Sequence, residues 1–367
     1  MNRKPRFLLR LGASILVLAA LVLTPRSTLA VPQPPQSQNP NPVPCSAVNP
    51  DPTCSTGQII PGPFEKSISN PLLGPGTAGS WTEYGAMSPS VLWINPTYMM
   101  WYSGTDADFV SAIGYATSGN GVVWSEYASN PVLTKGAPGS WDAGGVSFAS
   151  VIPDGDGYKM WYTGTGGGLR RIGYATSADG ILWEKFTGNP VLTVGSAGAW
   201  DANRVSNPTV VKVGSTYHLW YSSGLGSAGG IGHATSPDGT TWTKDAANPV
   251  LPAGSGSWDD VIFAPAVIYE DCKFQLFYTG CDSTQALCQI GFSTSLDGIT
   301  WTKRGVVLAV GGAGAFDANL VGYPSVMLGV PYYRLWYTGT GADELYRIGL
   351  ATALRLDKWL YLPAVLK

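Results

Sequence analysis

The sequence is poor in charge and in histidine. Only 13% of its 367 residues are charged, which is about half the usual share. It contains 2 histidines and no Cys-x-x-Cys motif. These residues are too few for the usual zinc ligand sets, so we predict neither a metal site nor a cofactor.

Long apolar runs are also missing, apart from one at the N-terminus. There, residues 2–10 are basic, residues 11–24 are apolar and residues 28–30 are small. This order is typical of a cleaved export signal, and the apolar run is shorter than the ~20 residues of a membrane span. We predict a signal peptide over residues 1–30, cleaved near Ala30, a secreted or cell-surface protein and no membrane span.

The charge balance bears on possible partners. The predicted signal peptide holds five basic residues, so 17 (22 − 5) remain against 24 acidic ones, a net charge of about −7. A negative chain is a poor ligand for phosphate backbones, and we predict no nucleic-acid partner.

A unit of about 60 residues occurs five times in the remaining chain. The aromatic residue of its SWD-type segment recurs at steps of 60, 59, 58 and 58 residues. These residues are Trp81, Trp141, Trp200, Trp258 and Phe316. Each unit offers four short strand-like runs separated by turn residues, which predicts four antiparallel strands per unit.

Such units repeated radially predict an all-β fold, a five-bladed β-propeller over residues 58–359. One valine per unit should occupy the matching place on each innermost strand: Val91, Val151, Val210, Val267 and Val326. Residues 31–57, rich in Pro, Gln, Asn and Ser, are predicted to be a spacer, and residues 360–367 a C-terminal tail. We expect a monomer.

Two segments compete to complete the fifth blade. The segment around Phe64 resembles the outer-strand segment that ends at Asn189, so an N-terminal strand could close the ring. Residues 348–359, however, keep the spacing that leads to an outer strand in the other units. The sequence leaves both possibilities open.

The five cysteines suit an oxidising compartment. Cys281 and Cys288 flank the predicted hairpin between the second and third strands of the fourth blade, so we predict a disulfide between them. We expect Cys45 to pair with Cys54, which would leave Cys272 unpaired.

Residues that recur from unit to unit are interpreted as structural. The SxDGxxW pattern, as in residues 177–183, places Asp-Gly in a turn and a Trp between blades. The Asp of the SWD segment recurs in four units, with Thr82 in the first, and is interpreted as a turn or strand-entry cap. His233 aligns with aromatic residues and is interpreted as a packed substitute for them.

The combined pattern NPVL…GSWD…MWYTGT…IGYATSxDGIxWxK resembles the five-bladed propeller superfamily of glycoside hydrolase families 32, 43, 68, 117 and 130. This resemblance implies carbohydrate chemistry on one face of the ring, often on furanosides or mannosides. It also implies catalytic acids on innermost strands, commonly just before a proline or small residue. The matching positions here are Ser88, Phe148, Asn207, Ala264 and Tyr323, and none is acidic.

If the chain is a glycosidase, its two carboxyl groups must therefore come from elsewhere on that face. Repeat-breaking acids near the start of the innermost strands make Glu83 and Asp260 the predicted catalytic pair. The predicted substrate-binding residues are Arg204, Asn207, Tyr323, Asp106 and Arg170. A solvated polar rim explains the same acids without any function.

Three functions remain open. The first is a carbohydrate-active protein that hydrolyses a furanoside or mannoside bond in an oligosaccharide or polysaccharide. The second is a catalytically inactive glycan-binding propeller, and the third is a surface scaffold.

Overall fold

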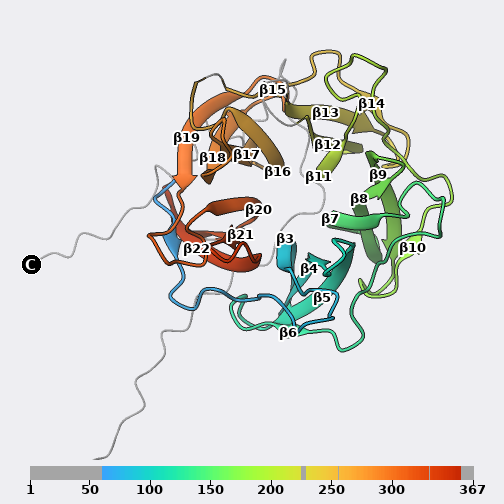
Figure 1. The fold of residues 1–367 in the computed structure, drawn as a ribbon. Helices are drawn as coiled ribbons and strands as arrows, with labels where there is room; N and C mark the ends of the chain where they lie inside the picture. The colour runs from blue at the N-terminus through green and yellow to red at the C-terminus, as the bar shows by residue number, and fades with distance from the viewer. Residues whose placement is uncertain (1–59, 225–228, 255, 330, 357–367) are drawn as a thin grey trace, which may run out of the picture. The chain divides into compact units, whose positions relative to one another are not determined.

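The protein, described by a computed structural model over residues 60–224, 229–254, 256–329 and 331–356, is built from β-strands. The strands form five blades around a central axis (Figure 1). This confirms the predicted all-β, five-bladed propeller. The predicted signal peptide, spacer and tail lie outside the described residues. Within the described ranges, no helix is long and apolar enough to cross a membrane.

Four blades are meanders of four antiparallel strands in chain order from the axis outward. The first comprises β3 (Gly85–Ile94), β4 (Thr97–Thr105), β5 (Ser111–Ser118) and β6 (Ser125–Glu126). The second comprises β7 (Gly145–Asp154), β8 (Gly157–Gly166), β9 (Leu169–Ser177) and β10 (Glu184–Lys185). The third comprises β11 (Ser206–Val213), β12 (Thr216–Ser223), β13 (Gly230–Ser236) and β14 (Thr243–Lys244), with β15 (Leu251–Pro252) also on β13. The fourth comprises β16 (Val261–Glu270), β17 (Lys273–Cys281), β18 (Cys288–Ser295) and β19 (Thr302–Leu308).

The fifth blade joins the two ends of the described chain. It comprises β20 (Leu320–Leu328), β21 (Tyr332–Thr340), β22 (Arg347–Leu356) and the N-terminal β2 (Glu65–Lys66), with β1 (Ile60–Pro61) also on β22. Lys66 lies opposite Ala351 in this pairing. The N-terminal segment is thus the outer strand that closes the ring, which decides between the two possibilities left open by the sequence.

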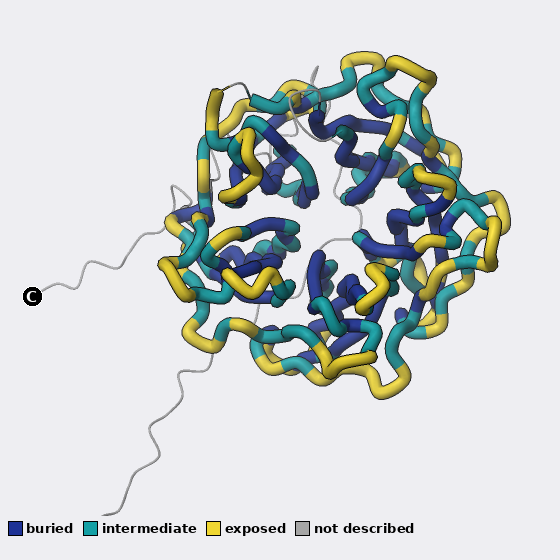
Figure 2. Tube along the Cα trace, viewed as in Figure 1, coloured by how far each residue is buried: buried dark blue, intermediate teal, exposed yellow. Residues whose placement is uncertain are grey.

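The five predicted valines occupy matching positions on the innermost strands. Val91, for example, lies opposite Met100 on the second strand of its blade. The equivalent pairs are Val151 with Met160, Val210 with Leu219, Val267 with Leu276, and Val326 with Leu335. In Figure 2 burial is concentrated in the strands near the axis, while exposed residues follow the outer loops.

The recurrent Asp of the SWD segment has a structural role. Asp201 is buried and forms an ion pair of 2.5 Å with Lys244 on the outermost strand of its blade. The second, fourth and fifth blades repeat this pair as Lys185–Asp142, Lys303–Asp259 and Lys66–Asp317. The first blade has Thr82 and Glu126 at these places, and the Tyr102 hydroxyl donates a hydrogen bond of 2.5 Å to Glu126. The recurrent Asp therefore has a structural role, but as the buried partner of an ion pair and not as the predicted turn or strand-entry cap.

The SxDGxxW turns connect neighbouring blades. Trp161 of the second blade donates a hydrogen bond of 2.8 Å from Nε1 to the carbonyl of Gly239 in the turn of the third blade. Its ring also meets Trp242 edge-on, at 6.2 Å between ring centroids. Equivalent tryptophan contacts occur at the Trp101–Trp183, Trp220–Trp301 and Trp336–Trp124 junctions. The tryptophans therefore pack between blades, as predicted.

The cysteines and His233 give mixed results for the predictions. Cys281 and Cys288 are cross-strand neighbours joined by a disulfide, with 4.1 Å between their Cα atoms. Cys272 is also disulfide-bonded, so the prediction that it stays unpaired is wrong. The predicted Cys45–Cys54 bond lies outside the described residues. His233 is buried, and its ring packs on Trp220 with 5.0 Å between the ring centroids. This confirms the predicted role of His233 as a packed substitute for an aromatic residue.

Candidate functional site

One face of the propeller carries the candidate site. All five innermost strands (β3, β7, β11, β16 and β20) begin at this face, and the hairpins between the second and third strands turn there. We call it the entry face. A few residues after its start, each innermost strand contains a β-bulge, where its pairing with the second strand shifts register.

At each bulge one residue adopts an uncommon backbone conformation. The residues are Ser88, Phe148, Asn207, Ala264 and Tyr323, with φ between 49° and 56°. This left-handed region is unfavourable for non-glycine residues, and such strain tends to concentrate at functional sites. They are the same five positions that the sequence comparison placed before a proline or a small residue.

Hydroxyl groups of the preceding blade hold each bulge in place. The backbone N–H of Tyr323 donates to Thr279 Oγ1 at 2.8 Å, and that of Asn207 donates to Thr163 Oγ1 at 3.0 Å. Ser88, Phe148 and Ala264 bond in the same way to Thr338, Ser103 and Ser222. The strained conformation is therefore built into every blade junction, and the side chain alone distinguishes one bulge from another.

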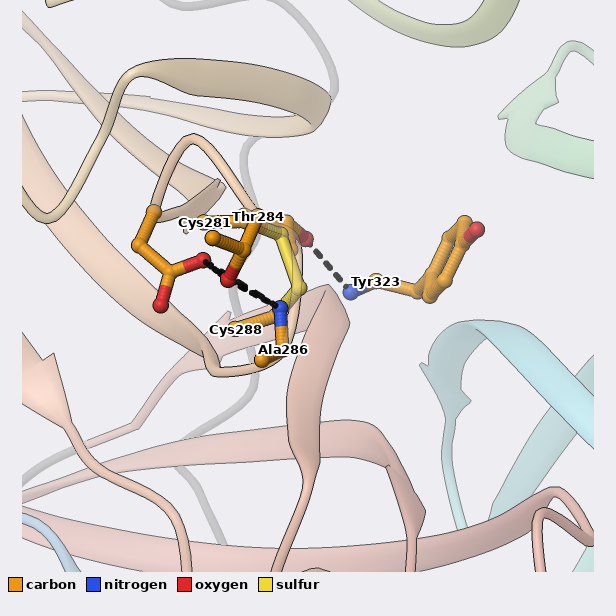
Figure 3. The surroundings of a disulfide bond; sticks show 7 residues. Cys281, Thr284, Ala286, Cys288 and Tyr323 are labelled. Carbon is orange, nitrogen blue, oxygen red and sulfur yellow. Dashed lines mark hydrogen bonds between the residues drawn. A yellow bond between two sulfur atoms is a disulfide. The ribbon is translucent and has the colours of Figure 1, made fainter.

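Two of these side chains meet across the axis. Tyr323 of the fifth blade and Phe148 of the second blade stack at 5.6 Å between ring centroids, with an angle of 2° between the ring planes. The Phe263 ring also packs on Tyr323, with 5.3 Å between the ring centroids. In Figure 3 the Tyr323 ring points away from the neighbouring Cys281–Cys288 disulfide. An aromatic cluster thus lies at the centre of the entry face.

A cavity of about 790 Å³ extends along the axis on the other side of this cluster. Its lining begins with the residue that follows each bulge, such as Ala149 and Pro324, and continues to the far ends of the innermost strands, such as Asp154 and Glu270. None of the five bulge residues lines it. The bulge residues therefore belong to the entry face, separate from the axial cavity.

The predicted binding residues Arg170, Arg204 and Tyr323 come together. Arg170 and Arg204 are partners in a parallel β-bridge between the second and third blades. Burial, followed by the positive charge of Arg170, lowers the pKa of Arg204. Burial raises the pKa of the Tyr323 hydroxyl, while the charges of Arg170 and Arg204 act to lower it. The Tyr323 hydroxyl therefore lies within electrostatic range of both guanidinium groups.

The predicted acids are bound within their own loops. Glu83 Oε2 accepts a hydrogen bond of 2.6 Å from the Gly79 N–H, and Asp260 Oδ1 accepts one of 2.8 Å from the Ser257 N–H. Asp106 Oδ1 accepts from the N–H groups of residues 108 and 110, at 3.0 and 2.9 Å. Glu83 and Asp260 belong to the first and fourth blades, which are not neighbours in the ring. Their predicted catalytic role stays a prediction.

Some features of this face are not predictable from sequence patterns alone. The contact between Phe148 and Tyr323 joins blades that are not neighbours in the chain. The exposed Phe109 also packs on Tyr84, at 4.6 Å between ring centroids. The sequence signal that could have identified the Phe148 contact is an aromatic residue at a position where other repeats, such as those of Ser88 and Ala264, carry a small residue. For metal ligands, no group of three or more His, Cys, Asp or Glu side chains in the described part of the chain could hold an ion.

Comparisons with known sequences give relatives without an assigned activity. No protein-family model matches the chain. Uncharacterized proteins from two strains of Mycobacterium tuberculosis, CDC 1551 / Oshkosh and ATCC 25618 / H37Rv, are 28% identical over 286 residues. The match covers 74% of this chain and 93% of each relative. The match therefore spans nearly the whole length of each relative.

Comparisons with solved structures identify the class of fold. A glycosyl hydrolase from Bacteroides ovatus matches with a TM-score of 0.64 and 17% identity, covering 80% of this chain and 94% of its own. A glycoside hydrolase family 130 structure, described as targeting beta-1,2 mannosidic linkages in Candida mannan, has a TM-score of 0.64 and 16% identity, covering 81% and 95%. Beta-1,2-mannobiose phosphorylase from Listeria innocua has a TM-score of 0.61 and 14% identity, covering 78% and 96%. The predicted resemblance to the propeller glycoside hydrolase superfamily is confirmed at the level of the fold.

Proposed function

We propose that the protein binds a glycan on its entry face without cleaving it. The observation that carries this proposal is the set of five bulge side chains at the axis. The family resemblance assigns catalytic acids to these positions, yet they hold hydroxyl, phenyl, amide, methyl and phenol groups. A glycosidase needs two carboxyl groups at the scissile bond, and the bulges supply none.

The groups that are present suit binding. Aromatic rings offer apolar faces that can pack against the C–H groups of a sugar, and Tyr323 and Phe148 lie together at the axis. Asn207 and the two arginines add polar groups around this cluster, which is the usual composition of a small-molecule site. The acids nearest the innermost strands are engaged as caps of their own loops, which further favours binding over hydrolysis.

We also place this function outside the cytoplasm. The Cys281–Cys288 disulfide favours an oxidising compartment. Residues 1–24 have the basic and then apolar order of an export signal, which also supports a location outside the cytoplasm. An extracellular glycan is therefore the proposed ligand.

Truncating the axial aromatic cluster should weaken glycan binding. We expect Phe148→Ala to lower the affinity about tenfold, since losing one buried aromatic contact at the centre of a site commonly costs about 1.4 kcal/mol. Alanine already occupies the equivalent bulge of the fourth blade, as Ala264 with φ of 49°, so the backbone should tolerate it. Isothermal titration against a panel of oligosaccharides measures the change. The exposed Val123→Ala serves as a matched control that should leave affinity unchanged. Equal affinities for wild type and Phe148→Ala would contradict the proposed location.

Hydrolysis is the second candidate, and the fold shared with glycoside hydrolases favours it. If the predicted acids act at a scissile bond, Glu83→Gln and Asp260→Asn should each lower turnover by orders of magnitude. We expect instead no sugar release from furanoside and mannoside panels by the wild type, and full glycan binding by both variants. Sugar release that either substitution abolishes would replace the binding proposal with an enzymatic one.

A further inference from the structure

We propose that Arg170 and Arg204 bind the carboxylate of an acidic sugar, a hexuronate, on the entry face. This inference rests on the glycan-binding function proposed above and names its ligand class.

The backbone brings the two arginines together from different blades. Arg170 lies at the start of β9 in the second blade, and Arg204 lies just before β11 in the third. They are partners in a parallel bridge, and the Val205 N–H donates to the Arg170 carbonyl at 3.0 Å. Bridged residues on adjacent strands carry their side chains on the same face of the sheet. The two guanidinium groups therefore extend from neighbouring positions.

The repeats supply an internal comparison for this junction. The equivalent positions at three other junctions hold Tyr346 with Gly85, Cys288 with Leu320, and Ser111 with Gly145. These pairs make the same kind of backbone approach with uncharged side chains. Holding the blades together thus does not require two cations, and the arginines at the second junction need another explanation.

The positive charge at this junction is not neutralised within the described part of the chain. The arginine ion pairs recorded there belong to Arg347 and Arg355. Arg204 is partly buried beside a second guanidinium group. Two like charges held together in a partly desolvated place repel each other, and a bound anion would offset that repulsion.

The surroundings narrow the choice of anion. Guanidinium groups bind carboxylates through paired N–H donors in a planar fork. The charges of both arginines act to lower the pKa of the Tyr323 hydroxyl, and the Tyr323 ring stacks on Phe148, so an aromatic surface lies near the positive charge. A ligand that offers both a carboxylate and an apolar sugar face satisfies both features. A bare inorganic anion would leave the aromatic cluster unused.

The test compares acidic sugars with their own neutral esters. Oligouronides of galacturonate, glucuronate and mannuronate are titrated into the full-length protein beside the methyl esters of the same oligosaccharides, which replace each negative charge by a neutral methyl ester. We expect one uronide series to bind at least tenfold more tightly than its ester. Arg170→Gln and Arg204→Gln should each weaken uronide binding about 10- to 100-fold, because each removes a charged hydrogen-bonding group. Ester binding should change little.

Arg171→Gln is the matched control. It removes the same charge from the next residue of β9, whose side chain points to the opposite face of the strand, so uronide affinity should stay within about twofold. Arg204→Lys keeps the charge but loses the fork, and it should fall between wild type and Arg204→Gln. Thermal unfolding of each variant confirms that it is folded.

The outcomes separate the two proposals. If uronides and esters bind equally and the arginine variants change nothing, the carboxylate site is overturned while glycan binding stands. If no saccharide binds to the folded wild type, both proposals fail. Selective loss of uronide binding in the Arg170 and Arg204 variants, with Arg171→Gln unaffected, supports the site.

Discussion

Lys66→Met should lower the free energy of unfolding by about 3 kcal/mol, the low end of the range for breaking a buried ion pair. Lys66 lies on β2, the N-terminal strand that closes the ring, and its Nζ is 2.7 Å from Asp317 Oδ2. The Asp317 side chain is 2% exposed, so removing the lysine leaves a buried carboxylate without its cation. Lys66 is itself 27% exposed, so we expect a loss of stability at the low end of the range for buried ion pairs.

Urea denaturation followed by circular dichroism measures this loss. Glu65→Gln, on the same two-residue strand but exposed, is the control and should change stability by less than about 0.5 kcal/mol. The double variant Lys66→Met/Asp317→Asn should recover part of the loss, because it no longer buries an uncompensated charge. If Lys66→Met unfolds at the same urea concentration as Glu65→Gln, the Lys66–Asp317 ion pair does not stabilise the fifth blade.

Trp220→Ala should be at least as destabilising, at about 3–5 kcal/mol, the usual cost of truncating a buried aromatic side chain to alanine. Trp220 is 0% exposed and lies at the junction of the third and fourth blades. Its Nε1 donates to the Gly298 carbonyl at 2.9 Å, and its ring meets Trp301 edge-on at 6.2 Å. The substitution leaves a cavity between two blades.

The fourth blade provides the control for this variant. Phe277 occupies the place of Trp220 there, fully buried. Trp220→Phe should therefore keep most of the packing and lose one hydrogen bond, at a cost of about 1 kcal/mol. Gly298 keeps a second donor, Trp301 Nε1 at 3.1 Å, so its carbonyl is not left unpaired. A Trp220→Ala variant as stable as Trp220→Phe would contradict the packing role.

The candidate site was only partly predictable. Arg170, Arg204 and Tyr323 stand out because they break the repeat, and the structure brings them together. Glu83 and Asp260 break the repeat as well, yet each caps its own loop. A departure from the repeat identifies an unusual residue but does not show which way its side chain points. Whether a side chain faces the axis or its own turn depends on backbone geometry that no residue pattern specifies.

The sequence by itself determined the architecture, because five units with the same strand and turn signals can bury their apolar faces only by stacking around an axis. It also determined the Cys281–Cys288 bond, since both cysteines flank one hairpin. The tertiary structure alone decided that β2 closes the ring and that Cys272 is bonded. It alone revealed the stacking of Phe148 on Tyr323 across the axis. These contacts join residues far apart in the chain, and a local pattern carries no information about which distant partner a closed ring brings near.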